Sequence, residues 1–333
     1  MPLRVGEVIG ETARAVSGYI AVPPGDDPGT RIPITVITGV RDRPVLALIA
    51  GTHGSEPSPI LALQRVRAQL DPAVLGGTVI LVHIANLPSF VHRTIYRGPW
   101  DQKNLNRVYP GRPGGTISER IAHAITTQVI EQCDFLVDMH SGDGNEALRP
   151  YSYWNKLGLD AHVDTVAREM ALAFGLDHIV IDTGRPRDFD ASVFTSNTAH
   201  LRGKPAVTTE AGGVGVPTEL MVQLNTDGAL RVLRYLGMLP GERETVTRPR
   251  WIDPSVVLTS PQDGIWLPAV SPDQHVNPGD VFGRLTDYFG QPTATVTAPI
   301  GGVVLYVVVS PAMSLGEPLG MIGTIAPGVD DPR

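Results

Sequence analysis

Residues 44–56 read PVLALIAGTHGSE, an apolar run that ends in small residues, a histidine and a glutamate. The uninterrupted run at 45–50 is typical of a strand buried on both faces of a sheet. The glycines that follow let a ligand approach the backbone closely. His53 and Glu56 lie three positions apart, so one turn of chain can direct both side chains to a single metal ion.

A second apolar run ends in a similar way. Residues 135–142 read FLVDMHSG, and His140 would complete a set of two nitrogens and one carboxylate oxygen. Such a set leaves a fourth zinc position open for water, which is the catalytic rather than the structural pattern. The spacing alone also fits the alternative that both histidines are hydrogen-bonded structural residues. Asp138 either fixes a ligand imidazole or only satisfies nearby backbone groups.

Two further segments carry polar side chains suited to a substrate. Asn106 and Arg107 precede a Pro-Gly turn signal, and a planar guanidinium suits bidentate recognition of a carboxylate. The alternative for this segment is a solvated loop with a surface ion pair. Glu210 ends the apolar run at 206–209, just before a glycine pair. Near a metal-bound water it would be a general base, although it could also cap a helix or pair with an arginine.

The motifs GTHGSE (51–56), NLNRVYPG (104–111), DMHSG (138–142) and TEAGG (209–213) occur in this order. In that order they resemble the succinylglutamate desuccinylase/aspartoacylase family, a branch of the zinc carboxypeptidase superfamily. The resemblance covers most of the chain. It implies that His53, Glu56 and His140 are the metal ligands and that each subunit binds one Zn²⁺.

The same resemblance implies roles in hydrolysis. Glu210 matches the catalytic glutamate, and Asn106 and Arg107 match the pair that holds the free carboxylate of the substrate. An upstream arginine polarises the scissile carbonyl in the family; Arg93 is the better match and Arg97 the reserve. The expected enzyme is a zinc-dependent amidohydrolase, which removes a small acyl group such as acetyl or succinyl from an N-acyl amino acid by attack of a metal-bound water.

Two alternatives to this function stay open. The first is a zinc carboxypeptidase that acts on short peptides, and the second is a non-catalytic, ligand-binding relative. Polar residues beyond His140 are candidates to line a substrate pocket or only to order a loop: Asp143, Asn145, Glu146 and Tyr153. Arg185 and Arg187 would meet a second substrate carboxylate or form exposed ion pairs.

Strand and helix patterns alternate along the first part of the chain. Apolar runs predict strands at 31–40, 45–50, 78–85, 135–139, 178–182 and 206–209, and periodic apolar positions predict helices at 57–70, 116–132, 161–174 and 218–236. Thr116 and Glu119 form a candidate capping box. The alternation predicts an α/β domain with a mixed, mostly parallel sheet and helices on both faces, as in zinc carboxypeptidases. Its site is expected at the carboxyl ends of the strands.

The pattern changes after about residue 244. Short apolar runs between prolines and glycines predict strands at 255–258, 264–267, 281–285, 293–296 and 302–309. We therefore expect a catalytic domain at 1–244 and a small all-β domain at 245–333. Residues 298–304 resemble the hairpin of biotinyl and lipoyl carrier domains, but no lysine follows Lys204, so a carrier function is excluded.

Composition limits the partners. The chain has 333 residues, a net charge of −7 and no dense basic run, which argues against nucleic acid. No apolar segment approaches the length of a membrane span, and the N-terminal residues lack the pattern of a secretory signal. The single cysteine, Cys133, fits a reducing compartment. We expect a cytoplasmic enzyme with a small-molecule substrate, no membrane or nucleic-acid partner, and a possible homo-oligomeric assembly.

Overall fold

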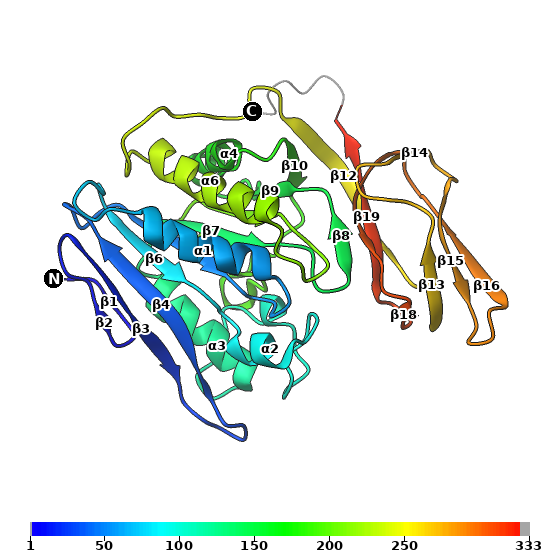
Figure 1. Cartoon of the computed structure of the whole chain (residues 1–333), viewed down its shortest axis with the longest axis horizontal. Helices are drawn as coiled ribbons and strands as arrows, with labels where there is room; N and C mark the ends of the chain where they lie inside the picture. The colour runs from blue at the N-terminus through cyan, green and yellow to red at the C-terminus, as the bar shows by residue number, and fades with distance from the viewer. Residues whose placement is uncertain (1, 327–333) are drawn as a thin grey trace.

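One long mixed sheet runs through the protein, whose computed structural model describes residues 2–326 (Figure 1). Its central strands are Tyr151–Asn155 (β9), Ala206–Glu210 (β11), Phe135–His140 (β7), Val45–Ala50 (β5) and Thr78–Val82 (β6). They lie side by side in the order β9-β11-β7-β5-β6. The last four run parallel to one another, whereas β9 is antiparallel to β11. The carboxyl ends of β5, β7 and β11 therefore meet at one edge.

Antiparallel strands extend the sheet beyond β6. They are Thr30–Thr38 (β4) and Arg14–Val22 (β3), next to a small hairpin of Arg4–Val5 (β1) and Val8–Ile9 (β2). On the other side of the centre, His178–Asp182 (β10) runs parallel to β9. The strands predicted in this part of the chain are thus present, and β1, β2, β3 and β9 are additions that the sequence reading did not include.

Helices cover both faces of the sheet. Pro57–Gln69 (α1), Ala161–Phe174 (α4) and Glu219–Tyr235 (α6) pack together over one face and share its apolar core. Ile117–Ile125 (α3) and Thr195–Leu201 (α5) contribute to the apolar core of the opposite face. A short helix, Leu87–His92 (α2), lies near the carboxyl edge (Figure 1). The predicted fold class, a mixed α/β sheet with helices on both faces, is confirmed.

The helix predicted at 116–132 is present but not uniform. Thr116 and Glu119 form the predicted capping box at its start. After α3 the helix widens into a π-helical turn at Thr126–Ile130 (η2). Thr127 Oγ1 donates a hydrogen bond to the carbonyl of His123, 2.9 Å away. This back-bonding by a threonine hydroxyl competes with the regular helical pattern and bends helices.

After α6 the described chain contains strands and turns but no helix, and its first strand begins at Arg250. Arg250–Thr259 (β12) pairs with β10 and with Pro318–Ile325 (β19), so the main sheet continues into this region. The sheet then passes to Gly302–Val308 (β17) and His275–Val276 (β14). A second sheet contains Gly264–Pro268 (β13), Val281–Thr286 (β15), Pro292–Thr297 (β16) and Ala312–Met313 (β18). The domain boundary near residue 244 stays a prediction, because strand pairing continues across it.

Residues 250–325, which we call the β region, also contact the α/β part of the chain directly. Glu146–Leu148 (β8), which follows His140, pairs antiparallel with β17. This pairing brings Tyr306 of the β region opposite Leu148. Among residues 2–326, no helix has the length and apolar character needed to cross a membrane.

Candidate active site

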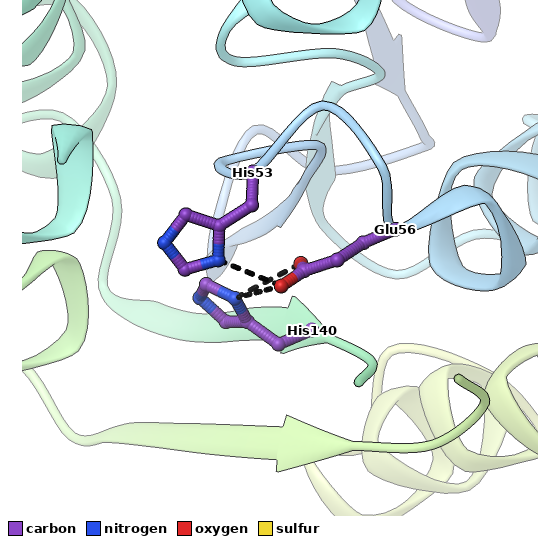
Figure 2. Close-up of side chains that lie close together, drawn as sticks. All are labelled: His53, Glu56 and His140. Atoms are coloured by element: carbon purple, nitrogen blue, oxygen red, sulfur yellow. Dashed lines mark hydrogen bonds and ion pairs between the residues drawn. The ribbon is translucent and has the colours of Figure 1, made fainter. Parts of the chain in front are cut away.

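Three side chains converge at the carboxyl edge of the sheet, two from the loop after β5 and one from the end of β7 (Figure 2). β5 ends at Ala50, and Gly51 adopts a left-handed conformation (φ 69°) that turns the chain toward His53. Glu56 lies at the N-cap of α1, whose first residue is proline. His140 is the last residue of β7. We refer to His53, Glu56 and His140 as the triad.

The triad has the geometry of a metal site. His53 Nδ1 lies 2.7 Å from Glu56 Oε1, and His140 Nδ1 lies 3.1 Å from Glu56 Oε2. One candidate ligand atom from each side chain lies within 4.8 Å of the others. Glu56 and His140 are both 2% exposed. The structure thus brings together the three residues that the sequence predicted as ligands.

The electrostatics of the triad favour a bound cation. Burial alone would raise the pKa of the Glu56 carboxyl, but the two imidazoles outweigh this effect and lower the pKa to about 2. Burial disfavours the charged form of His140, yet Asp138 and Glu56 raise its pKa well above the usual value. A buried carboxylate is therefore ionised beside two nitrogens, and this donor set fits zinc.

The Nε2 atoms of His140 and His53, which face away from Glu56, each lie close to a side-chain oxygen. Asp138 Oδ1 lies 3.2 Å from His140 Nε2, so a carboxylate stands at ion-pair distance behind a candidate ligand imidazole. Asn104 Oδ1 lies 3.1 Å from His53 Nε2. Both contacts leave the Nδ1 atoms directed at Glu56. The sequence reading named Asp138 but missed Asn104, which lies two residues before Asn106 in the quoted motif.

Glu210 lies beside the triad. It is the last residue of β11 and pairs in register with His140 on β7. Burial raises the pKa of its carboxyl well above the usual value; His140 opposes this shift and Glu56 adds to it. Glu210 therefore combines proximity to the triad with an elevated basicity.

Asn106 and Arg107 lie on a single 3₁₀ turn, Leu105–Arg107 (η1). The amide nitrogen Nδ2 of Asn106 lies 3.4 Å from His140 Nε2. The guanidinium of Arg107 donates a hydrogen bond to the Asn106 carbonyl at 2.8 Å and lies 4.8 Å from the centre of the Phe194 ring. Desolvation and the neighbouring Arg185 lower the pKa of Arg107. The structure thus places Asn106 beside the triad.

The comparisons with known proteins decide the family. A family model described as the succinylglutamate desuccinylase/aspartoacylase catalytic domain matches residues 42–236, more than half of the chain. The chain belongs to this family. The resemblance predicted from the four motifs is confirmed.

Individual relatives extend the match beyond the catalytic region. An N-alpha-acetyl-L-2,4-diaminobutyric acid deacetylase from Halomonas elongata is 29% identical over 280 residues, which cover 81% of this chain and 79% of that protein. A product-bound ectoine utilization protein EutE from Ruegeria pomeroyi is 26% identical, with a TM-score of 0.81 and coverage of 94% and 97% of the two chains. A succinylglutamate desuccinylase from a Silicibacter species is 25% identical, with a TM-score of 0.81 and coverage of 94% and 95%.

In this family member, a cavity of about 450 Å³ borders Arg107. Its lining includes Tyr153, Arg185 and Phe194, together with residues of β12 and β19 such as Met321. Arg185 forms an ion pair with Asp182 (2.5 Å) and lies 4.0 Å from the centre of the Phe194 ring. Of the candidates for a second carboxylate contact, Arg185 therefore lines the cavity, whereas Arg187 is exposed.

The polar residues after His140 make contacts that order their loop. Tyr96 donates its hydroxyl to Glu146 Oε1 (2.7 Å) and its backbone N–H to Asp143 Oδ2 (3.0 Å). Burial raises the pKa of Asp143 to about 6 and that of Glu146 to about 7. The backbone carbonyl of Asn145 accepts a hydrogen bond from the N–H of Val309 in the β region.

Within residues 2–326, neither Arg93 nor Arg97 forms a hydrogen bond or ion pair with the triad. Arg93 ends α2 in a left-handed conformation (φ 55°), is exposed, and lines a cavity of about 490 Å³ beside Gly54 and Ser55. Arg97 is also exposed and donates to the carbonyl of Gln102 at 3.2 Å. The role of Arg93 in polarising the scissile carbonyl, with Arg97 in reserve, stays a prediction.

Tyr306 is a site neighbour that the sequence reading missed. It lies on β17 in the β region, and burial raises the pKa of its hydroxyl well above the usual value. Glu146, Tyr153 and Glu210 add to this shift and Arg107 opposes it, so Tyr306 lies within electrostatic range of these groups. A single tyrosine within a strand pattern does not indicate from the sequence that its side chain lies near the site.

Proposed function

We propose that this chain is a zinc-dependent amidohydrolase that removes a small acyl group from an N-acyl amino acid. The observation that carries this proposal is the convergence of His53, Glu56 and His140 within 4.8 Å, with Glu210 on the adjacent strand. Family membership adds support, because the relatives include a deacetylase and a desuccinylase.

The triad would hold one zinc ion through two imidazole nitrogens and a carboxylate, with a position left for solvent. Zinc held by these residues would supply hydroxide near neutral pH, because it would lower the pKa of bound water toward about 7. The chain contributes by keeping the Glu56 carboxylate ionised and by fixing both imidazoles through Asn104 and Asp138.

Glu210 would be the general base. Its carboxylate accepts the proton of the attacking water and passes it to the departing nitrogen of the substrate. Because burial raises the pKa of Glu210, its carboxylate is a stronger base than an exposed glutamate. Proton transfer by a positioned side chain of this kind contributes about 10²–10⁴ in rate.

Asn106 and Arg107 would hold the free carboxylate of the substrate. A guanidinium can donate two parallel hydrogen bonds to a carboxylate, and the adjacent amide can donate a third. Asn106 is buried, so few water molecules compete for its amide, whereas the side chain of Arg107 is exposed. The substrate is thereby held in register with Glu210 and the triad, which makes the reaction effectively unimolecular.

The cavity of about 450 Å³ beside Arg107 has room for a small substrate. Residues of β12 and β19, including Val257 and Met321, line one side of it. A carboxypeptidase requires an open groove for the rest of the peptide chain. The Halomonas relative is a deacetylase of an N-acetyl diamino acid, so acylated diamino acids belong among the first substrates to test. A cytoplasmic location and a homo-oligomeric assembly stay predictions from the sequence.

The decisive experiment is a substrate panel assayed after chelation and after zinc is restored. The panel contains N-acetyl and N-succinyl derivatives of 2,4-diaminobutyrate, glutamate and aspartate, beside unblocked dipeptides and tripeptides. We expect hydrolysis of at least one N-acyl amino acid that depends on added zinc. Preferential cleavage of the peptides would favour a carboxypeptidase, and turnover that is indifferent to zinc would contradict the proposal.

A further inference from the structure

The amide group of Asn106 has a fixed orientation. Both the backbone N–H of Thr195 (2.9 Å) and its hydroxyl Oγ1 (3.1 Å) donate to Asn106 Oδ1. Only the oxygen of an amide side chain can accept hydrogen bonds from these two donors, because its NH₂ group donates and does not accept. The nitrogen Nδ2 must therefore point away from Thr195.

The hydrogens of Asn106 Nδ2 are available to a ligand. Nδ2 lies 3.4 Å from His140 Nε2, but Asp138 Oδ1 lies 3.2 Å from that same ring nitrogen. When His140 Nδ1 binds a metal, the ring proton is on Nε2, at ion-pair distance from Asp138. A protonated nitrogen cannot accept from the amide. The NH₂ group is thus left to donate to another acceptor, such as a carboxylate.

Thr195 is itself held rigidly. It is fully buried and is the first residue of α5, where backbone N–H groups lack partners within the helix. A pair of backbone hydrogen bonds between Tyr109 and Val193 (2.8 and 3.3 Å) ties the segment before α5 to the segment after η1. Val193 adopts φ 71°, which is strained for a β-branched residue. The surrounding contacts therefore impose this conformation on the chain.

We propose that Thr195 is a positioning residue, which fixes the Asn106 amide with its NH₂ end toward the substrate carboxylate. The proposal rests on the proposed role of Asn106 in carboxylate binding. Without the Thr195 hydroxyl, the amide is held by one donor instead of two and can rotate. Rotation would present its oxygen to the carboxylate, and the two acceptors repel each other.

The test compares Thr195→Val with Thr195→Ser in the zinc-loaded enzyme. Valine keeps the shape of threonine but removes the hydroxyl, so KM for the best N-acyl amino acid should rise about 3- to 10-fold. The value of kcat should change less than twofold, and Thr195→Ser should retain the KM of the wild type. Thr198→Val is the matched control: Thr198 is buried in the same helix and bonds to Ser192 and the Phe194 carbonyl.

Coupling to Asn106 separates positioning from a general loss of structure. In an Asn106→Ala background, Thr195→Val should no longer change KM, because the group that it orients is gone. A KM increase of the same size in that background would overturn the proposal. An equal KM increase in Thr198→Val, or an unchanged KM in Thr195→Val, would also overturn it.

A binding measurement distinguishes this inference from the proposed function. If the zinc-loaded wild type hydrolyses nothing in the panel, the proposed function fails. Calorimetric titration with N-acetyl-L-2,4-diaminobutyrate then compares the Kd values of the wild type, Thr195→Val, Thr195→Ser and Thr198→Val. A Kd that rises about 3- to 10-fold in Thr195→Val alone would support the positioning role. Equal Kd values, or no binding by the wild type, would overturn it.

Discussion

Asp138 Oδ1 lies 3.2 Å from Nε2 of His140, and both side chains are buried. In a neutral imidazole, a carboxylate at this position favours the proton on Nε2, which leaves the lone pair on Nδ1, the nitrogen that faces Glu56. One contact thus sets both the tautomer and the direction of a candidate metal ligand. Asn104 provides the equivalent acceptor for His53 at 3.1 Å.

Asp138→Asn should therefore weaken zinc binding. The amide that replaces the carboxylate is neutral and a weaker acceptor, so the basicity of His140 falls. We expect zinc affinity to drop by about 10–100-fold, measured by competition with a chromophoric chelator. Asp26→Asn is the control, because Asp26 is exposed and far from the triad in sequence. Unchanged zinc affinity in Asp138→Asn would show that the imidazole is oriented by other contacts.

Glu210→Gln should separate metal binding from catalysis. Glutamine keeps the shape of glutamate but cannot accept the proton of the attacking water. We expect the variant to bind zinc at the level of the wild type, by elemental analysis, and to lose about 10²–10⁴ in kcat. Glu131→Gln, an exposed substitution on the protein surface, should leave both quantities unchanged. Near-normal hydrolysis by Glu210→Gln would remove this residue from the mechanism.

Arg107→Ala should chiefly raise KM for substrates with a free carboxylate. A hydrogen bond to a charged group contributes about 1.5–3 kcal/mol, which corresponds to a KM increase of about 10–100-fold. The control is the substrate itself: the corresponding N-acyl amino acid amide lacks the carboxylate, so its KM should differ little between Arg107→Ala and the wild type. Equal effects on the acid and the amide would place the carboxylate contact elsewhere.

The fold and the triad were predictable because local patterns determine them. The apolar runs before His53 and His140 predict strands, and the ends of parallel strands meet at one sheet edge. β5 and β7 do lie side by side, which brings the two histidines together. The capping box of Thr116 and Glu119 was predictable for the same reason, since its partners are three residues apart.

The groups around the triad depend on contacts between distant parts of the chain. Thr195 reaches Asn106, and Tyr306 reaches the site because β8 pairs with β17. Single threonines and tyrosines occur throughout strands and helix starts, so the sequence contains no signal of these contacts. The position of Arg93 is also set by tertiary packing, since it depends on where α2 ends.

Gly54→Ala should disturb the triad through backbone overlap. A Cβ atom at Gly54 would lie 2.1 Å from the carbonyl carbon of Ser89 and 2.2 Å from the backbone nitrogen of Phe90. Backbone atoms in α2 cannot rotate away as a flexible side chain can, so either α2 or the loop between His53 and Glu56 must move. We expect destabilisation of about 1–3 kcal/mol, together with weaker zinc binding, because the two ligands flank the displaced residue.

The control for this prediction is Gly114→Ala. Gly114 is exposed, and a Cβ atom there would meet no atom within 4 Å. The free energy of unfolding of Gly114→Ala should stay within about 0.5 kcal/mol of that of the wild type. Thermal unfolding in the presence and absence of a chelator, combined with zinc titration, checks both variants. If Gly54→Ala binds zinc as tightly as Gly114→Ala, the spacing of His53 and Glu56 does not depend on the close approach of this loop to α2.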